Sequence, residues 1–97
     1  MWFKVKRYEH NRVRNVNGKV ISRTYSYIIV VRRWFKKPMY LRLLPGWYDL
    51  LMEGGICKVE LTRNISNATD FRDDDGLRKA EKVIRKIKEE PDKFVLN

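Results

Sequence analysis

Lysine, arginine and aromatic residues alternate through the first third of the chain. If Asn17-Gly18 is the two-residue turn of a β-hairpin, residues at equal distances from it face each other, and each facing pair points to one side. One side then collects a ladder of cations and rings, diluted by a few aliphatic residues. Its members are Trp2, Lys4, Lys6, Tyr8, His10, Arg12 and Arg14 on the first strand, with Ile21, Arg23, Tyr25, Tyr27, Ile29, Val31 and Arg33 on the second.

Such a ladder has the chemistry of a nucleic-acid-binding face. Cations neutralise phosphates and release counterions, and tyrosine rings offer flat surfaces on which bases stack. Single-stranded RNA or DNA suits it because unpaired bases are free to stack, whereas a twisted ribbon could also lie in the major groove of duplex DNA. The structural alternative is that tyrosines stabilise the strand pair and cations protect its edges from aggregation. The residues we expect to bind nucleic acid are Lys4, Lys6, Tyr8, His10, Arg12, Arg14, Arg23, Tyr25, Tyr27 and Arg33.

The charge is distributed unevenly, which favours the functional interpretation. The net charge of the 97-residue chain is +10. Residues 1–48 hold twelve Lys or Arg, a single acid (Glu9) and ten of the twelve aromatic residues, whereas residues 49–97 hold ten bases and eleven acids. One basic, aromatic half indicates a surface suited to a polyanion.

The sequence does not predict a catalytic, metal or cofactor site. Cys57 and His10 are the only residues of their types, so they cannot form a zinc site by themselves. His10 has no sequence partner for catalysis, and Cys57 falls among the inward residues of a strand. The aspartates at 70 and 73–75 do not match a calcium-binding loop, so we expect 73–75 to cap a helix instead. We therefore expect a protein that is not an enzyme.

The elements follow from periodicity and turn residues. Strands are predicted over 2–14, 19–35, 39–44 and 56–63, and the apolar run 28–31 indicates burial on both faces of a central strand. Residues 47–53 fit either a short helical turn or a strand. Apolar residues from 77 to 87 recur at helical spacing, and Pro91 ends that helix. The segment 94–96 is expected to lie on the core as a tail.

These elements predict one small basic α+β domain over residues 1–97. We expect an antiparallel β-sheet made of a long N-terminal hairpin and two or three more strands, packed by one C-terminal amphipathic helix. The longest apolar run, residues 27–31, is far shorter than the roughly 20 residues needed to span a bilayer. We therefore expect no membrane partner and a cytoplasmic, intracellular location.

Three functions compete at this point. The first is non-enzymatic binding of nucleic acid through the hairpin. The second is a small viral or mobile-element interaction or inhibitor protein that binds a host protein through its basic face or a sheet edge; such an edge could also form a homodimer. The third is a small ribonuclease that uses His10.

Overall fold

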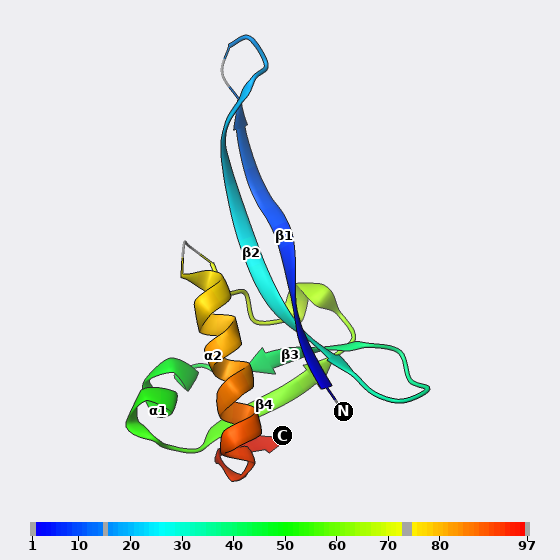
Figure 1. Cartoon of the computed structure of the whole chain (residues 1–97), viewed down its shortest axis with the longest axis vertical. Helices are drawn as coiled ribbons and strands as arrows, with labels where there is room; N and C mark the ends of the chain where they lie inside the picture. The colour runs from blue at the N-terminus through cyan, green and yellow to red at the C-terminus, as the bar shows by residue number, and fades with distance from the viewer. Residues whose placement is uncertain (1, 15, 73–74, 97) are drawn as a thin grey trace.

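Over the residues that it describes, namely 2–14, 16–72 and 75–96, the computed structural model is an α+β fold with a five-stranded sheet and two α-helices (Figure 1). The side chains of residues 10–14 and 20–23 are outside this description. The strands lie in the sheet in chain order. The elements are β1 (Trp2–Arg14), β2 (Val20–Arg32), β3 (Met39–Leu43), α1 (Trp47–Glu53), β4 (Cys57–Thr62), the 3₁₀ turn η1 (Ile65–Asn67), α2 (Gly76–Glu89), the 3₁₀ turn η2 (Pro91–Lys93) and β5 (Phe94–Leu96).

The central part of β2 is buried on both sides of the sheet, as the sequence predicts. Ile28, Ile29, Val30 and Val31 are each at most 5% exposed, although successive side chains point to opposite faces. Ile29 and Val31 belong to the core cluster that includes residues of α2. In Figure 1, α2 lies on the viewer's side, and the chain between β4 and α2 passes behind β2. The central strand is therefore held from both faces.

Helix α2 (Gly76–Glu89) covers one face of the sheet with its apolar side. Ala80 and Val83 are fully buried in the core cluster. Asp75 occupies the N-cap position as expected, but its side chain makes no capping hydrogen bond. The other two predicted capping residues, 73 and 74, lie outside the described part of the chain.

The segment 69–71, shortly before α2, lies between β2 and β3 where these two strands diverge. The backbones of Tyr27 and Phe71 exchange two hydrogen bonds, of 3.0 and 2.8 Å. The amide of Thr69 donates to the carbonyl oxygen of Leu41 at 3.2 Å, and the amide of Leu43 donates to the Thr69 hydroxyl at 2.7 Å. This segment ties the middle of β2 to β3.

Two parts of the fold differ from the expectation of an antiparallel sheet packed by one helix. Residues 47–53 form a second helix, α1, which is the helical one of the two alternatives that the sequence leaves open and which ends at Gly54 with a φ of 75°. The C-terminal segment is strand β5, which pairs in parallel with β4 through Cys57 and Phe94. The sheet is therefore mixed, although its other strand pairs are antiparallel.

The hairpin register also corrects the predicted ladder. The expected pairing holds near the turn, from Asn11 opposite Thr24 to Val13 opposite Ser22, but the register shifts by one between residues 9 and 11. The extra residue on β1 forms a β-bulge. From the bulge to the start of β1, each residue of β1 is therefore paired with a residue of β2 one position away from the predicted partner, and the predicted partner points to the opposite side. From residue 2 to residue 9, the even-numbered residues of β1 consequently face the even-numbered residues of β2.

The turn is longer than predicted. β1 ends at Arg14, which pairs with Val20, so that residues 15–19 connect the strands. Gly18 has the expected positive φ of 79°, whereas Asn17 is not among the described residues with positive φ. A type I′ turn needs positive φ at both of its central residues, so the predicted two-residue turn is wrong.

The hairpin projects from the body of the protein as an arm (Figure 1). Within the described chain, the residues of β2 between the turn and Tyr27 pair with β1 alone, and Tyr27 is the first that also pairs with another segment. The radius of gyration is 15.3 Å and the longest extent is 52 Å. A compact chain of this length has a radius of gyration of about 12.5 Å. We call residues 8–26 the arm; at about 3.3 Å per residue, each of its strands is roughly 20 Å long.

The start of α2 gives a test of this packing. A Cβ atom at Gly76 would lie 2.5 Å from the carbonyl oxygen of Phe71 and 2.9 Å from the ring of Tyr27. Alanine normally stabilises a helix relative to glycine by up to about 1 kcal/mol. We expect Gly76→Ala instead to lower the free energy of unfolding by about 1–3 kcal/mol, because the helix start must move away from the sheet. Urea denaturation measures the change.

Gly55→Ala is the matched control. Its new Cβ would meet mainly the flexible end of Leu50, at 3.1 Å, so the free energy of unfolding should change little. A Gly76→Ala protein at least as stable as the wild type would contradict the docking of α2 onto Tyr27 and Phe71.

Candidate nucleic-acid interface

Four residues of β1 form a stripe on the side of the sheet away from α2. Trp2, Lys4, Lys6 and Tyr8 follow one another at every second position, and the intervening Phe3 and Val5 pack against the core cluster. Both lysines are exposed, and Trp2 is 42% exposed. The ammonium group of Lys6 lies 5.1 Å from the centre of the Tyr8 ring, within the range of a cation–π contact. We call these four residues the β1 stripe; it contains three of the predicted site residues.

The other side of the hairpin carries a second pairing of a cation with a ring. The guanidinium carbon of Arg7 lies 4.7 Å from the centre of the Tyr25 ring. Tyr25 and Tyr27, predicted to lie on the same side as Lys6 and Tyr8, therefore lie on the opposite side, because of the bulge in β1. Tyr27 packs against the core cluster, so its ring contributes to folding.

The far half of the arm contains the remaining predicted cations. The side chains of His10, Arg12, Arg14 and Arg23 lie outside the described residues, so only the backbone positions of these four are described. The register makes Arg12 and Arg23 direct cross-strand partners. The arm therefore has cationic residue types at facing positions of both strands.

Arg33 lies at the other end of β2, away from the arm. Its guanidinium donates a hydrogen bond to the sulfur of Met39 at 2.8 Å, and its Nε is buried without a hydrogen-bond partner. The predicted strand 19–35 ends at Arg32, so that Arg33 begins the connection to β3. The predicted site residues therefore do not form one continuous face.

Sequence reasoning missed three exposed residues beside the β1 stripe. Arg32 is the cross-strand partner of Trp2 and is exposed. Trp34 and Phe35 follow it in the loop to β3, with 72% and 102% of their surfaces exposed. The sequence Arg-Arg-Trp-Phe-Lys-Lys at positions 32–37 carries the signal for this surface, because its two rings lie between cations, although the pattern also fits the end of a strand.

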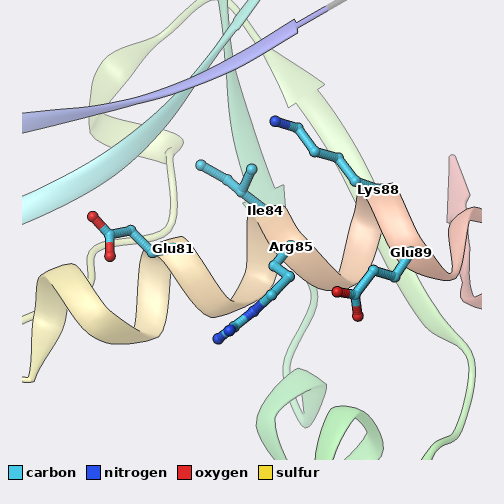
Figure 2. Close-up of a pocket in the computed structure, with 5 residues that line it drawn as sticks. All are labelled: Glu81, Ile84, Arg85, Lys88 and Glu89. Carbon is cyan, nitrogen blue, oxygen red and sulfur yellow. The ribbon is translucent and has the colours of Figure 1, made fainter.

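The outer surface of α2 is a weaker candidate for binding an anion. Figure 2 shows a hollow along this helix in which two carboxylates and two cations interleave around one aliphatic residue. Opposite charges at this spacing largely offset each other, unlike those of the arm. The lining residues are Glu81, Ile84, Arg85, Lys88 and Glu89.

The groups considered for catalysis or metal binding are not assembled into a site within the described part of the chain. Cys57 is 1% exposed, and its thiol lies 3.6 Å from the carbonyl oxygen of Trp47. Burial raises the pKa of the Cys57 thiol, which disfavours the nucleophilic thiolate. Asp70 forms an ion pair with Arg72 at 3.1 Å. Among the described residues, no group of three or more His, Cys, Asp or Glu side chains could hold a metal ion.

The comparisons with known family models, curated proteins and solved structures gave no match to this chain. Among the described residues, no helix is long and apolar enough to cross a membrane.

The buried position of Cys57 predicts an unreactive thiol. We expect a thiol reagent at mildly alkaline pH to modify the native protein at least about tenfold more slowly than the urea-unfolded chain, because reaction requires local opening. The absorbance of the released chromophore measures both rates. Equal rates would contradict the burial of the Cys57 thiol against α1.

Proposed function

We propose that this protein binds nucleic acid without catalysing a reaction, using the basic and aromatic N-terminal hairpin. The observation that carries the proposal is the projecting arm, in which β1 and β2 remain paired with each other away from the body of the protein. Glu9 is the only acid among residues 1–48. An arm of this composition extends cationic groups to a distance from the more evenly charged half of the chain.

The binding energy would come mainly from phosphate contacts. Each Lys or Arg that neutralises a phosphate releases condensed counterions, so affinity depends steeply on salt. Lys4, Lys6 and Arg7 are exposed on the two sides of β1, and Lys6 and Arg7 lie close to the rings of Tyr8 and Tyr25 respectively. Those rings can pack on sugars or unpaired bases once the cations have engaged the backbone.

The two-sided distribution supports contacts on both sides of the ribbon. A two-stranded ribbon fits a duplex major groove that is about 12 Å wide and 8.5 Å deep, and the arm is longer than this depth. In that position its opposite sides would contact the phosphates of opposite groove walls. Binding to single strands uses the same cations along one side.

A protein partner is the second candidate, favoured by the position of β1 at the edge of the sheet. An edge strand can pair with a strand of another protein or of a second copy. The bulge at residue 10 and the cations of β1 oppose such pairing, because both are features that protect edges from strand addition. We therefore rank this function below nucleic-acid binding.

Replacing Arg12, Arg14 and Arg23 together with alanine tests the assignment to the arm. We expect affinity for both duplex and single-stranded oligonucleotides to fall for all sequences alike, because phosphate contacts carry no base information. The slope of log K against log salt concentration should flatten by about 0.7–0.9 for each phosphate that is no longer neutralised. Fluorescence anisotropy across a salt series provides both quantities.

The control removes the same charge from the outer side of α2, as Arg78→Ala, Arg85→Ala and Lys88→Ala. If binding is located on the arm, the control should keep most of the wild-type salt slope. Equal losses in the two triple variants would mean that net charge alone attracts the nucleic acid, and the arm would not be the binding site.

A further inference from the structure

The β1 stripe continues into the loop between β2 and β3. The Trp2 ring meets the Trp34 ring edge to face, with centroids 5.5 Å apart, and the Phe35 ring follows at 6.3 Å from Trp34. From Tyr8 through Lys6, Lys4 and Trp2 to these two rings, cations and aromatic rings therefore form one line. We call this line, Tyr8–Lys6–Lys4–Trp2–Trp34–Phe35, the edge track.

The loop end of the track holds its rings in water. Trp34 is 72% exposed and Phe35 is 102% exposed, so neither ring is explained by packing of the core. Phe35 has a φ of 56°, a left-handed conformation that is unfavourable for a bulky aromatic residue. Strained backbone of this kind is concentrated at functional sites, where a contact made by the side chain offsets its cost.

The charges beside the track identify the kind of partner. Arg32 is exposed opposite Trp2, and Lys36 and Lys37 are exposed directly after Phe35. The sequence contains no acid between Glu9 and Asp49, so nothing in the loop offsets these cations. Exposed rings surrounded by positive charge suit a polyanion that itself carries flat apolar groups, and nucleic acid has both features.

We propose that the edge track binds an extended single strand of RNA or DNA, with unpaired bases stacked on Trp34 and Phe35 and phosphates at Lys4, Lys6 and Arg32. This inference rests on the proposed function and names its ligand more closely. Alternate residues of a strand are about 6.7 Å apart, a step that an extended polynucleotide can follow along β1. In duplexes the base faces are stacked inside the helix, so the loop rings can use only unpaired bases.

The linear form of the site favours a nucleic acid over a membrane. Trp and Phe between cations are also typical of loops that insert into anionic bilayers. The cations and rings of β1, however, extend from the loop along one side of an edge strand, beside residues of β2 that are no more than 5% exposed. A bilayer contacts a protruding tip, whereas a polynucleotide can contact the whole line.

The test replaces both loop rings with leucine, as Trp34→Leu and Phe35→Leu in one protein. Leucine keeps apolar surface but has no ring face for a base. Loss of stacking on one ring is expected to weaken binding roughly 5- to 150-fold, so we expect the double variant to bind labelled oligo(dT) and oligo(U) at least about tenfold more weakly. Duplex affinity should change less than threefold. Fluorescence anisotropy at about 150 mM salt measures these affinities, and flotation with phosphatidylserine-containing vesicles is run in parallel.

Leu50→Ala with Ile56→Ala is the matched control, because it alters two exposed apolar residues around α1, outside the edge track. It should leave single-strand affinity unchanged. Circular dichroism and thermal unfolding of each variant verify that it is folded.

The outcomes separate this inference from the proposed function. Wild-type binding to single strands that survives the leucine replacements would overturn the base-stacking role of the loop while leaving nucleic-acid binding intact. A wild type that binds none of the oligonucleotides at about 150 mM salt would overturn both. Vesicle binding by a wild type that binds no oligonucleotide would likewise overturn both.

Discussion

Burial of β2 on both faces is the constraint on which the rest of this structure depends. Ile28 to Val31 are almost inaccessible, and full burial of an aliphatic side chain is worth about 1.5–3 kcal/mol. Four such residues contribute roughly 6–12 kcal/mol as an upper estimate, comparable with the whole stability of a small domain. Because this segment is fixed, with Tyr27 bonded to Phe71, the continuation of β2 toward the turn leaves the body paired with β1.

The division of charge follows the same geometry. The half of the chain that builds the arm and β1 contains a single acid, whereas the half that builds the helices contains nearly equal numbers of acids and bases. Concentrated positive charge destabilises a folded protein by self-repulsion. The described cations reduce this repulsion by lying on different sides of the ribbon and beside rings, as Lys6 and Arg7 do. A bound polyanion would reduce the remaining repulsion between these cations. The distribution of charge is therefore consistent with the proposed ligand.

The main elements could be predicted from local patterns, but their relative register could not. The run 28–31 indicates a central strand, and the spacing from residue 77 to residue 87 indicates α2, because both patterns reflect burial on known faces. The bulge in β1 has no signal of its own, since no glycine or proline marks it, and the register beyond it places Tyr25 on the other side of the hairpin from Tyr8. The parallel pairing of β5 with β4 depends on tertiary packing, and the sequence of a three-residue segment does not specify it.

The candidate site was predicted in part for the same reason. Residue types and charge identified β1 and the arm, because the composition of a strand is the same whichever residues it pairs with. The loop rings Trp34 and Phe35 were missed because aromatic residues after an apolar run fit the end of a strand. Their exposure follows from the end of β2 at Arg32, which depends on where β3 pairs.

The most direct test of a nucleic-acid-binding hairpin is a map of backbone amide chemical shifts in isotope-labelled protein titrated with a short oligonucleotide at about 150 mM salt. We predict shifts concentrated in β1, the arm and residues 32–37, with α1 and the outer side of α2 almost unaffected. Shifts concentrated on either helix, or no shifts at that salt concentration, would contradict the claim that the N-terminal hairpin is a nucleic-acid-binding surface.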